Sequence, residues 1–212
     1  MQDAKAVATP MASSPRLTRS GTQHSNPKEF RQLVGSLQYL SFTRPDVAYA
    51  VNKLSQFMQF PTCDHWQAAK RVLRYLAGTA THGLFISRST NLTVHVFTDA
   101  DWAGDPSDYI STNGYIVYLG DQPISWSSRK QKGIARSSTE AEYRSIANTA
   151  SEVRWHLALD YHYIREQVQA GQLRIAHIST HDQLADGLTK PLTRSQFPAT
   201  RHKIGVSQPP PS

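Results

Sequence analysis

Residues 92–104 read LTVHVFTDADWAG, and this stretch predicts a β-strand. The segment from Leu92 to Thr98 is rich in β-branched residues, and its apolar side chains alternate with polar ones at a period of 2. This pattern is typical of a half-buried strand. Asp99 follows the run directly, so we expect its carboxylate at the end of the strand.

Two further strands are predicted immediately downstream. Asn113-Gly114 introduces the run YIVYL at 115–119, and Gly120-Asp121 turns into PISWS at 123–127. Asn-Gly and Gly-Asp pairs between apolar runs are typical of tight turns. The three runs together predict an antiparallel meander.

A long helix is predicted next, because residues 134–170 contain neither Gly nor Pro over 37 positions. The apolar residues that recur every three or four positions are Tyr143, Ala147, Ala150, Val153, Leu157, Tyr161, Ile164 and Val168. Their spacing predicts one amphipathic helix from about Ser137 to Ala170, too long to lie wholly on a small sheet. A short strand at 173–178 follows, and then a last helix that Asp182 caps and that ends at Pro191.

The first third of the chain carries helix signals instead. Asn26-Pro27-Lys28-Glu29 has the pattern of a capping box, and Arg44-Pro45 ends that helix. Asp46 begins a second helix, and Thr62 caps a third that ends at Gly78. We therefore expect a helical subdomain over residues 26–82.

Both ends of the chain have the composition of unstructured segments. Residues 1–25 hold Ser, Thr and Pro without an apolar period, and residues 207–212 include three successive prolines. We predict a flexible arm at 1–25 and a disordered tail at 207–212. The sheet and its helices would then occupy residues 83–206.

Composition limits the classes of function. The 212 residues include 23 Lys and Arg against 16 Asp and Glu, a formal net charge of +7 that favours polyanionic partners. Cys63 is the only cysteine, which excludes a disulfide framework and a cysteine-based zinc site. No apolar run is long enough to span a bilayer, and the first residues lack the apolar core of a secretory signal. We expect an intracellular protein, cytoplasmic or nuclear, with no membrane partner.

Asp99 and Glu142 are candidates for metal chemistry. Asp99 is expected on a strand, and Glu142 lies one turn into the long helix. Carboxylates that converge from a strand and an adjoining helix can hold two divalent ions at phosphodiester distance. An exposed Asp at a strand end or a Glu in a first helical turn can instead serve as a cap or as a partner of the helix dipole.

Several strings resemble the Pol polyproteins of copia-type LTR retrotransposons. FTDADWAG (97–104), SWSSRKQK (125–132) and ARSSTEAEY (135–143) are similar to the ribonuclease H domain of that family, as are DYHYIREQV (160–168) and STHDQLADGLTKPL (179–192). Upstream, LVGSLQYL (33–40), TRPD (43–46) and KRVLRYL (70–76) are similar to the connection segment that follows the reverse transcriptase palm. The resemblance covers roughly residues 26–206.

The resemblance implies an α/β fold with a ribonuclease H-like mixed sheet, preceded by the small helical subdomain. It also implies hydrolysis of the RNA strand of RNA/DNA hybrids by two-metal catalysis with Mg²⁺ or Mn²⁺. Of the family's four catalytic and metal-binding carboxylates, Asp99, Glu142 and Asp186 match three.

The fourth carboxylate of the family lies in a Cys-Asp-Asn string that is absent from this chain. In the family, a strand bearing that Asp and a further helix separate the counterparts of Trp155 and His156, which are adjacent here. We therefore expect an internal deletion, genomic or introduced by the gene model, and a truncated sheet that lacks one central strand. We further expect Asp99 and Glu142 to remain neighbours, Asp186 to be carried away from both, and the chain to be inactive.

A basic cluster precedes the long helix. Arg129, Lys130, Lys132 and Arg136 place four cations within nine residues, either as a solvated turn or as an edge that contacts the phosphates of an RNA/DNA hybrid. Lys70, Arg71 and Arg74 could extend that track. The sequence is compatible with three functions: a ribonuclease H, a catalytically dead nucleic-acid-binding remnant, or a decayed reading frame with no selected role.

Overall fold

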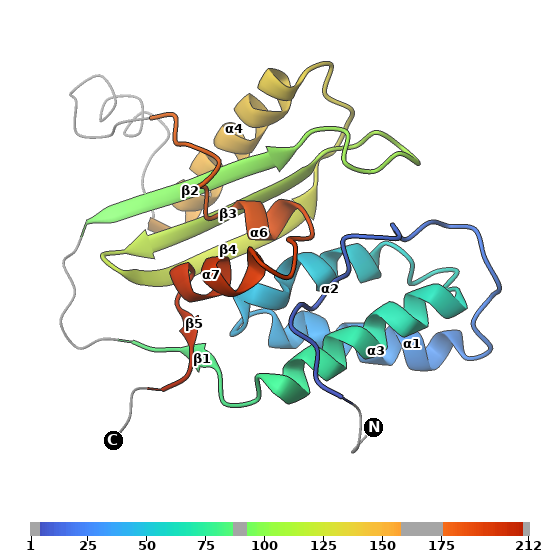
Figure 1. Ribbon diagram of the computed structural model, residues 1–212. Coiled ribbons are helices and arrows are strands. Elements are labelled where there is room, and N and C mark those ends of the chain that lie inside the picture. Colours follow the sequence, from blue (N-terminus) through green and yellow to red (C-terminus); the bar gives the residue numbers. More distant parts are fainter. Residues whose placement is uncertain (1–4, 87–92, 158–175, 210–212) are drawn as a thin grey trace.

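The computed structural model of the protein describes residues 5–86, 93–157 and 176–209, and its N-terminal part is helical (Figure 1). The helices are α1 (Pro27–Leu40), the 3-10 turn η1 (Pro45–Val47), α2 (Ala48–Ser55) and α3 (Cys63–Gly78). The Asn26 side chain accepts a hydrogen bond from the Glu29 amide, and the Thr62 side chain accepts one from the His65 amide. Both predicted caps are confirmed.

A three-stranded antiparallel sheet follows, in the order β2-β3-β4. Its strands are β2 (Val94–Asp101), β3 (Thr112–Leu119) and β4 (Gln122–Lys130). The predicted meander is confirmed, but Asp99 lies inside β2 instead of at its end. The reason is that Asn113 and Gly114, predicted as a turn, pair within the ladder and extend it to the pair of Asp101 with Thr112. A separate two-residue ladder joins β1 (Gly83–Leu84) to β5 (Val206–Ser207).

Helices cover both faces of this sheet. Helix α4 (Ser138–Leu157) lies on one face, whereas the short helices α6 (Asp186–Thr189) and α7 (Phe197–Lys203) lie on the other face with α2 (Figure 1). Side chains of adjacent strand residues point to opposite faces of a sheet. In β2, Thr98 therefore bonds to Ser145 of α4 on one face, and Asp99 bonds to Thr189 of α6 on the other. Helix α4 runs through the Trp155–His156 junction as far as Leu157. The rest of the predicted long helix lies outside the described residues.

The face that α4 turns to the sheet differs from the predicted stripe. Ser145 and Thr149 are buried there, whereas Tyr143 is 69% exposed. The Ser145 hydroxyl donates to the carbonyl of Asp99, and the Thr98 hydroxyl shares hydrogen bonds with both buried hydroxyls. Polar side chains can therefore occupy this interface, because each finds a partner on β2.

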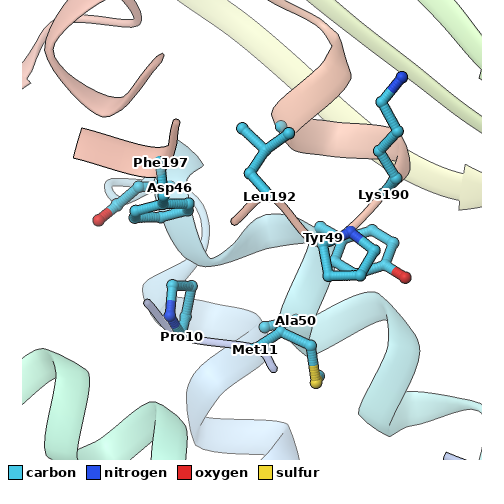
Figure 2. Close-up of a pocket in the computed structure, with 10 residues that line it drawn as sticks. Pro10, Met11, Asp46, Tyr49, Ala50, Lys190, Leu192 and Phe197 are labelled. Atoms are coloured by element: carbon cyan, nitrogen blue, oxygen red, sulfur yellow. The ribbon is translucent and has the colours of Figure 1, made fainter. Parts of the chain in front are cut away.

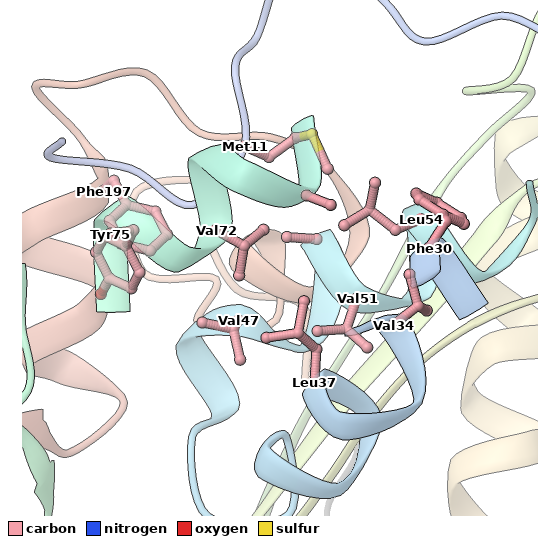
Figure 3. Close-up of a cluster of buried hydrophobic side chains, with 12 residues drawn as sticks. Met11, Phe30, Val34, Leu37, Val47, Val51, Leu54, Val72, Tyr75 and Phe197 are labelled. Carbon is pink, nitrogen blue, oxygen red and sulfur yellow. The ribbon is translucent and has the colours of Figure 1, made fainter. Parts of the chain in front are cut away.

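Two apolar cores hold the molecule together. The first fills the space between α1, α2 and α3 (Figure 3), and its buried side chains include Phe30, Val34, Leu37, Val47, Val51, Leu54, Val72 and Tyr75. The second lies between the sheet and the C-terminal helices, and its buried side chains are Ala48, Ile116, Tyr118, Leu188, Ile204 and Val206. Ala48 of α2 belongs to this second core, so the helical unit packs directly against the sheet unit.

The N-terminal arm differs from its prediction, because its described residues pack along the helices. Met11 is buried in the first core. Arg71 donates to the carbonyl and the hydroxyl of Thr9, and Arg74 donates to the carbonyl of Lys5. Arg71 and Arg74 of α3 thus bind the arm. They are therefore not free to extend the predicted phosphate-binding surface.

The C-terminal segment also departs from expectation. Residues 176–178 form no strand, and the remainder of the predicted strand lies outside the described residues. The last predicted helix begins at Asp186, four residues later than expected. Asp182 does not cap it, and its carboxylate accepts a hydrogen bond from the Ser179 hydroxyl instead. Ser207, predicted to be in a disordered tail, pairs with Gly83. Across the described ranges, no helix combines the length and apolar character needed to cross a membrane.

Candidate active site

The site is built where α6 rests directly on the sheet. Asp99 of β2 pairs with Gly114 of β3 in the ladder. A Cβ atom at position 114 would lie 2.8 Å from the side chains of both Leu188 and Thr189. The absent side chain therefore lets α6 approach the backbone of β3 beside Asp99.

This packing brings Asp99 and Asp186 together. The Thr189 hydroxyl donates to Oδ2 of Asp99 at 2.6 Å and lies 3.2 Å from the carbonyl oxygen of Asp186, so it connects the two residues. Burial raises the pKa of Asp186, the Lys190 ammonium opposes that shift, and the neighbouring Asp99 adds to it. The prediction that Asp186 is carried away from Asp99 is wrong. Leu188 is buried in the second core and holds α6 against the sheet.

Asp101 is a further carboxylate on the same face that the sequence analysis missed. Burial raises its pKa, Lys190 opposes the shift, and Asp99 adds to it. The spacing of the two aspartates carried a usable signal, since residues i and i+2 of a strand point to the same face. Lys190 was missed as well, although it lies four residues after Asp186.

Glu142, expected to remain a neighbour of Asp99, does not join Asp99 and Asp186 in one cluster of possible metal ligands among the described residues. It is exposed on α4, which covers the opposite face of the sheet from α6. Within residues 5–86, 93–157 and 176–209, no group of three or more His, Cys, Asp or Glu side chains could hold a metal ion. The residues present therefore do not fit a pair of divalent ions, and the pair that the structure brings together is Asp99 with Asp186.

The predicted basic cluster divides into two kinds of side chain. Arg129, Lys132 and Arg136 are exposed. Lys130 instead bonds to Asp105 at 2.7 Å and to Asp108 at 2.6 Å, with only 20% of its side chain exposed. Three of the four predicted cations are thus available to a partner, and Lys130 has a structural role.

Comparison with known proteins places the chain in a family. It is 56% identical, along its whole length, to the retrovirus-related Pol polyprotein from transposon RE2 of Arabidopsis thaliana. The chain belongs to the copia-type retrotransposon Pol polyproteins, as a segment of one. A second relative of this Pol segment is the Pol polyprotein from transposon TNT 1-94 of Nicotiana tabacum, 32% identical over 97% of the chain. A third is the putative transposon Ty5-1 protein YCL074W of Saccharomyces cerevisiae, 35% identical over 70% of the chain and 49% of that protein.

The Pol segment spans 17% of the RE2 polyprotein and 19% of the TNT 1-94 polyprotein. Neither a family model nor a solved structure matches it. The predicted membership in the Pol polyproteins is confirmed, and the mixed α/β architecture agrees with the predicted fold class.

A small pocket of the Pol segment lies where the arm, α2 and the C-terminal segment meet (Figure 2). Pro10 and Met11 line it from the arm, and Tyr49 lines it from α2. Figure 2 shows Lys190 at the rim with its ammonium group directed away from Pro10 and Met11. The ammonium pairs with Oδ1 of Asp186 at 3.0 Å.

Proposed function

We propose that this Pol segment is a ribonuclease H-like region that binds RNA/DNA hybrids without cleaving them. The observation that carries the binding part is the exposed trio of Arg129, near the end of β4, and Lys132 and Arg136, in the segment between β4 and α4. Arginine and lysine side chains on one short segment can contact successive phosphates and position a duplex by its backbone. The net charge of +7 adds a long-range attraction to the same partner.

The absence of cleavage is supported by the carboxylates. The family's Cys-Asp-Asn string is missing from the sequence, Glu142 lies on the other face of the sheet, and Asp186 pairs with Lys190. Two Mg²⁺ or Mn²⁺ ions need several oxygen ligands that converge on one place. Asp99 and Asp186 alone supply too few.

An internal deletion explains the missing carboxylate. The match to the RE2 polyprotein extends over 252 residues and takes in all 212 residues of the chain, so at least 40 positions of that match have no counterpart here. We place the deletion between Trp155 and His156. The deleted strand would have lain beside β2, which pairs only with β3 among the described strands.

Binding is tested with the full chain and an end-labelled RNA/DNA hybrid at several salt concentrations. Substitution of Arg129, Lys132 and Arg136 by Ala should weaken affinity about tenfold or more and flatten the salt dependence by a slope of about 2 to 3, because fewer counterions are released. A matched variant that loses the exposed cations Lys28, Arg31 and Arg194 should keep the slope close to that of the wild type. An unchanged slope in the first variant would contradict the proposal. Absence of hybrid binding by the wild-type chain would favour a decayed reading frame with no selected role.

Cleavage is tested on the same hybrid with Mg²⁺ and with Mn²⁺. We expect no RNA-strand cleavage by the wild-type chain. Turnover that Asp99→Asn abolishes would overturn this part of the proposal.

Repair of the deletion gives a converse test. A chain that carries the corresponding residues of the RE2 polyprotein between Trp155 and His156 should cleave the hybrid, with activity dependent on Asp99, Glu142 and Asp186. A repaired chain that is folded but inert would show that these three residues are wrongly assigned.

A further inference from the structure

Trp102 is an aromatic side chain that the packing of the chain does not explain. It follows β2 directly and is 47% exposed, although tryptophan is a residue type that proteins bury on average. The two other tryptophans whose side chains the structure describes are packed. Trp66 stacks on His24 with ring centroids 4.8 Å apart, and the Trp126 indole donates to the carbonyl of Ser41.

The indole of Trp102 is fixed against the segment that carries two of the exposed cations. Its Nε1 donates to the carbonyl of Ala135 at 3.0 Å, and Ala135 is buried. The N–H is the only polar group of an indole, so the exposed remainder of the ring is a carbon surface. This surface has no hydrogen bond left to make within the chain.

Two further hydrogen bonds hold the same segment, residues 131–136. The amide of Gln131 donates to the carbonyl of Ser111 at 2.9 Å, and Arg144 of α4 donates to the carbonyl of Gly133 at 3.0 Å. The exposed side chains of this segment are Lys132, Ile134 and Arg136. Cations and an aromatic ring are therefore presented together on a well-anchored surface.

We propose that Trp102 is a stacking platform for an unpaired nucleobase, so that this surface binds a single-stranded extension of the hybrid. The proposal rests on the proposed function in one respect, because it takes the trio of Arg129, Lys132 and Arg136 as the site that holds the hybrid. Every base has a flat π-face, and proteins hold single strands by stacking bases on aromatic rings beside cations that contact the phosphates. Bases inside a duplex already stack on one another, so a single-stranded extension supplies the base.

The charges around the ring suit the phosphates of such a strand. Arg16 of the arm donates to the carbonyl of Gly104, in the turn that begins at the tryptophan, and adds a cation on that side. The carboxylate beside the segment belongs to Glu140, and its oxygens are already engaged by the amide of Arg136 and by the guanidinium of Arg144. The Arg136 side chain thus remains exposed to a partner.

The test compares three labelled hybrids by fluorescence anisotropy with the full chain. One is blunt, one carries a single-stranded extension of about six nucleotides, and the third carries an abasic extension of the same length. The abasic extension keeps the phosphates and lacks the bases, so the comparison separates stacking from charge. The wild type should bind the base-bearing extension about fivefold or more tightly than the abasic one.

Variants of Trp102 assign this gain to its ring. Trp102→Ala should abolish the gain and leave the salt dependence of blunt-hybrid binding unchanged, because the cations remain. Trp102→Phe keeps a ring and should retain part of the gain, whereas Trp102→Leu keeps apolar volume alone and should lose it. Tyr39→Ala is the matched control, since it removes a ring that is 80% exposed on α1, and it should retain the whole gain. A 5-iodouracil base in the extension should photo-cross-link to Trp102.

Contrary results overturn the proposal without touching hybrid binding itself. Equal affinity of the wild type for base-bearing and abasic extensions would refute it, as would a cross-link that maps to another aromatic residue. A gain that survives Trp102→Ala would also refute it, and would assign the exposed ring to contact with a protein partner instead.

Two outcomes need a further comparison. If Trp102→Ala does not fold, the contrast between Trp102→Phe and Trp102→Leu decides the matter, together with the cross-link in the wild type. If the wild type binds no hybrid at all, the proposed function fails. The stacking proposal is then decided by base-bearing and abasic single strands alone, and equal binding of the two would refute it.

Discussion

The helical unit and the sheet unit are stabilised in different ways. Between α1, α2 and α3 the buried contacts are mainly apolar, with Phe30 and Leu54 fully enclosed. Between α4 and the sheet, hydroxyl groups and small side chains meet instead, and each hydroxyl depends on a named partner. Apolar burial is non-directional and its contribution grows with the area removed from water, whereas each hydroxyl contact depends on one specific partner and contributes little by itself. Single substitutions should therefore cost most in the core of the helical unit and least at the hydroxyl interface of the sheet unit.

Polar contacts also join the two units. The Trp126 indole donates to the carbonyl of Ser41 at 2.7 Å, and Asp105 binds both Lys53 of α2 and Lys130 of β4. Asp105 is thus the point through which an ion network connects helix and sheet.

The largest expected effect lies in the apolar core. Phe30→Ala should lower the free energy of unfolding by about 3–5 kcal/mol, because it removes a fully buried ring and leaves a cavity. Chemical denaturation of the full chain measures the change. Phe60→Ala, at a position that is 66% exposed, is the control and should stay within about 0.5 kcal/mol of the wild type. A loss below about 1 kcal/mol for Phe30→Ala would remove the contrast between the units.

The next effect concerns the ion network between the units. Burial alone would raise the pKa of Asp105, but hydrogen bonds from Lys130, Lys53 and Ser107 hold it well below its ordinary value. Asp105→Asn should cost about 2–3 kcal/mol at pH 7, since two largely buried ammonium groups lose their carboxylate.

The pH dependence of unfolding sharpens this prediction. Because the folded pKa of Asp105 lies below the unfolded value of about 3.9, its contribution is present above that pH and is lost as the pH falls below it. Asp105→Asn should therefore reduce the acid-induced loss of stability. Glu140→Gln, in an exposed pair with Arg144, is the control and should change the acid-induced loss of stability far less. Equal profiles for wild type and Asp105→Asn would exclude the network as a connection.

A smaller loss is expected where α6 contacts the sheet. Gly114→Ala should cost about 1–3 kcal/mol, because the new methyl group would press on Leu188 and Thr189. The matched control is Gly35→Ala in α1, where a Cβ meets nothing within 4 Å and helix propensity predicts a gain of about 0.5–1 kcal/mol. Thermal unfolding of both variants gives opposite signs if α6 packs as described. A gain in both would mean that α6 does not rest on Gly114.

The smallest effect tests the hydroxyl interface itself. Ser145→Ala should cost about 1 kcal/mol, because the carbonyl of Asp99 and the hydroxyl of Thr98 each lose a partner. Ser151, on the exposed side of α4, bonds only to the carbonyl one turn before it, so Ser151→Ala should be neutral or slightly stabilising. Denaturation curves that show the same change for both serines would refute a directional interface.

Local signals predicted the elements well, and tertiary contacts decided the rest. Asn26 and Thr62 start their helices as expected, because a cap depends on residues within one turn. The face of α4 was mispredicted because the periodicity started from Tyr143, whereas the buried face carries Ala141, Ser145 and Thr149. No sequence spacing reports that a hydroxyl will find its partner on a strand about 50 residues away.

The site shows the same limit. Asp99 and Asp186 were identified by resemblance, and the structure brings them together through Gly114, whose missing side chain matters only once α6 is in place. The role of Lys130 was mispredicted because its partners, Asp105 and Asp108, lie in the loop between β2 and β3. The sequence around Lys130 contains no sign of a contact with that loop.

The ladder between β1 and β5 has a consequence for how the sheet unit could be moved between proteins. Gly83 pairs with Ser207 and Leu84 pairs with Val206, so the first and last residues of the sheet unit lie next to each other. Units whose entry and exit points adjoin tolerate insertion into a host chain and circular permutation, because neither operation stretches the fold. The segment 83–207 could therefore be inserted into one surface loop of a host protein. A short linker from residue 207 to residue 83 would allow a circular permutant with new termini elsewhere in the segment.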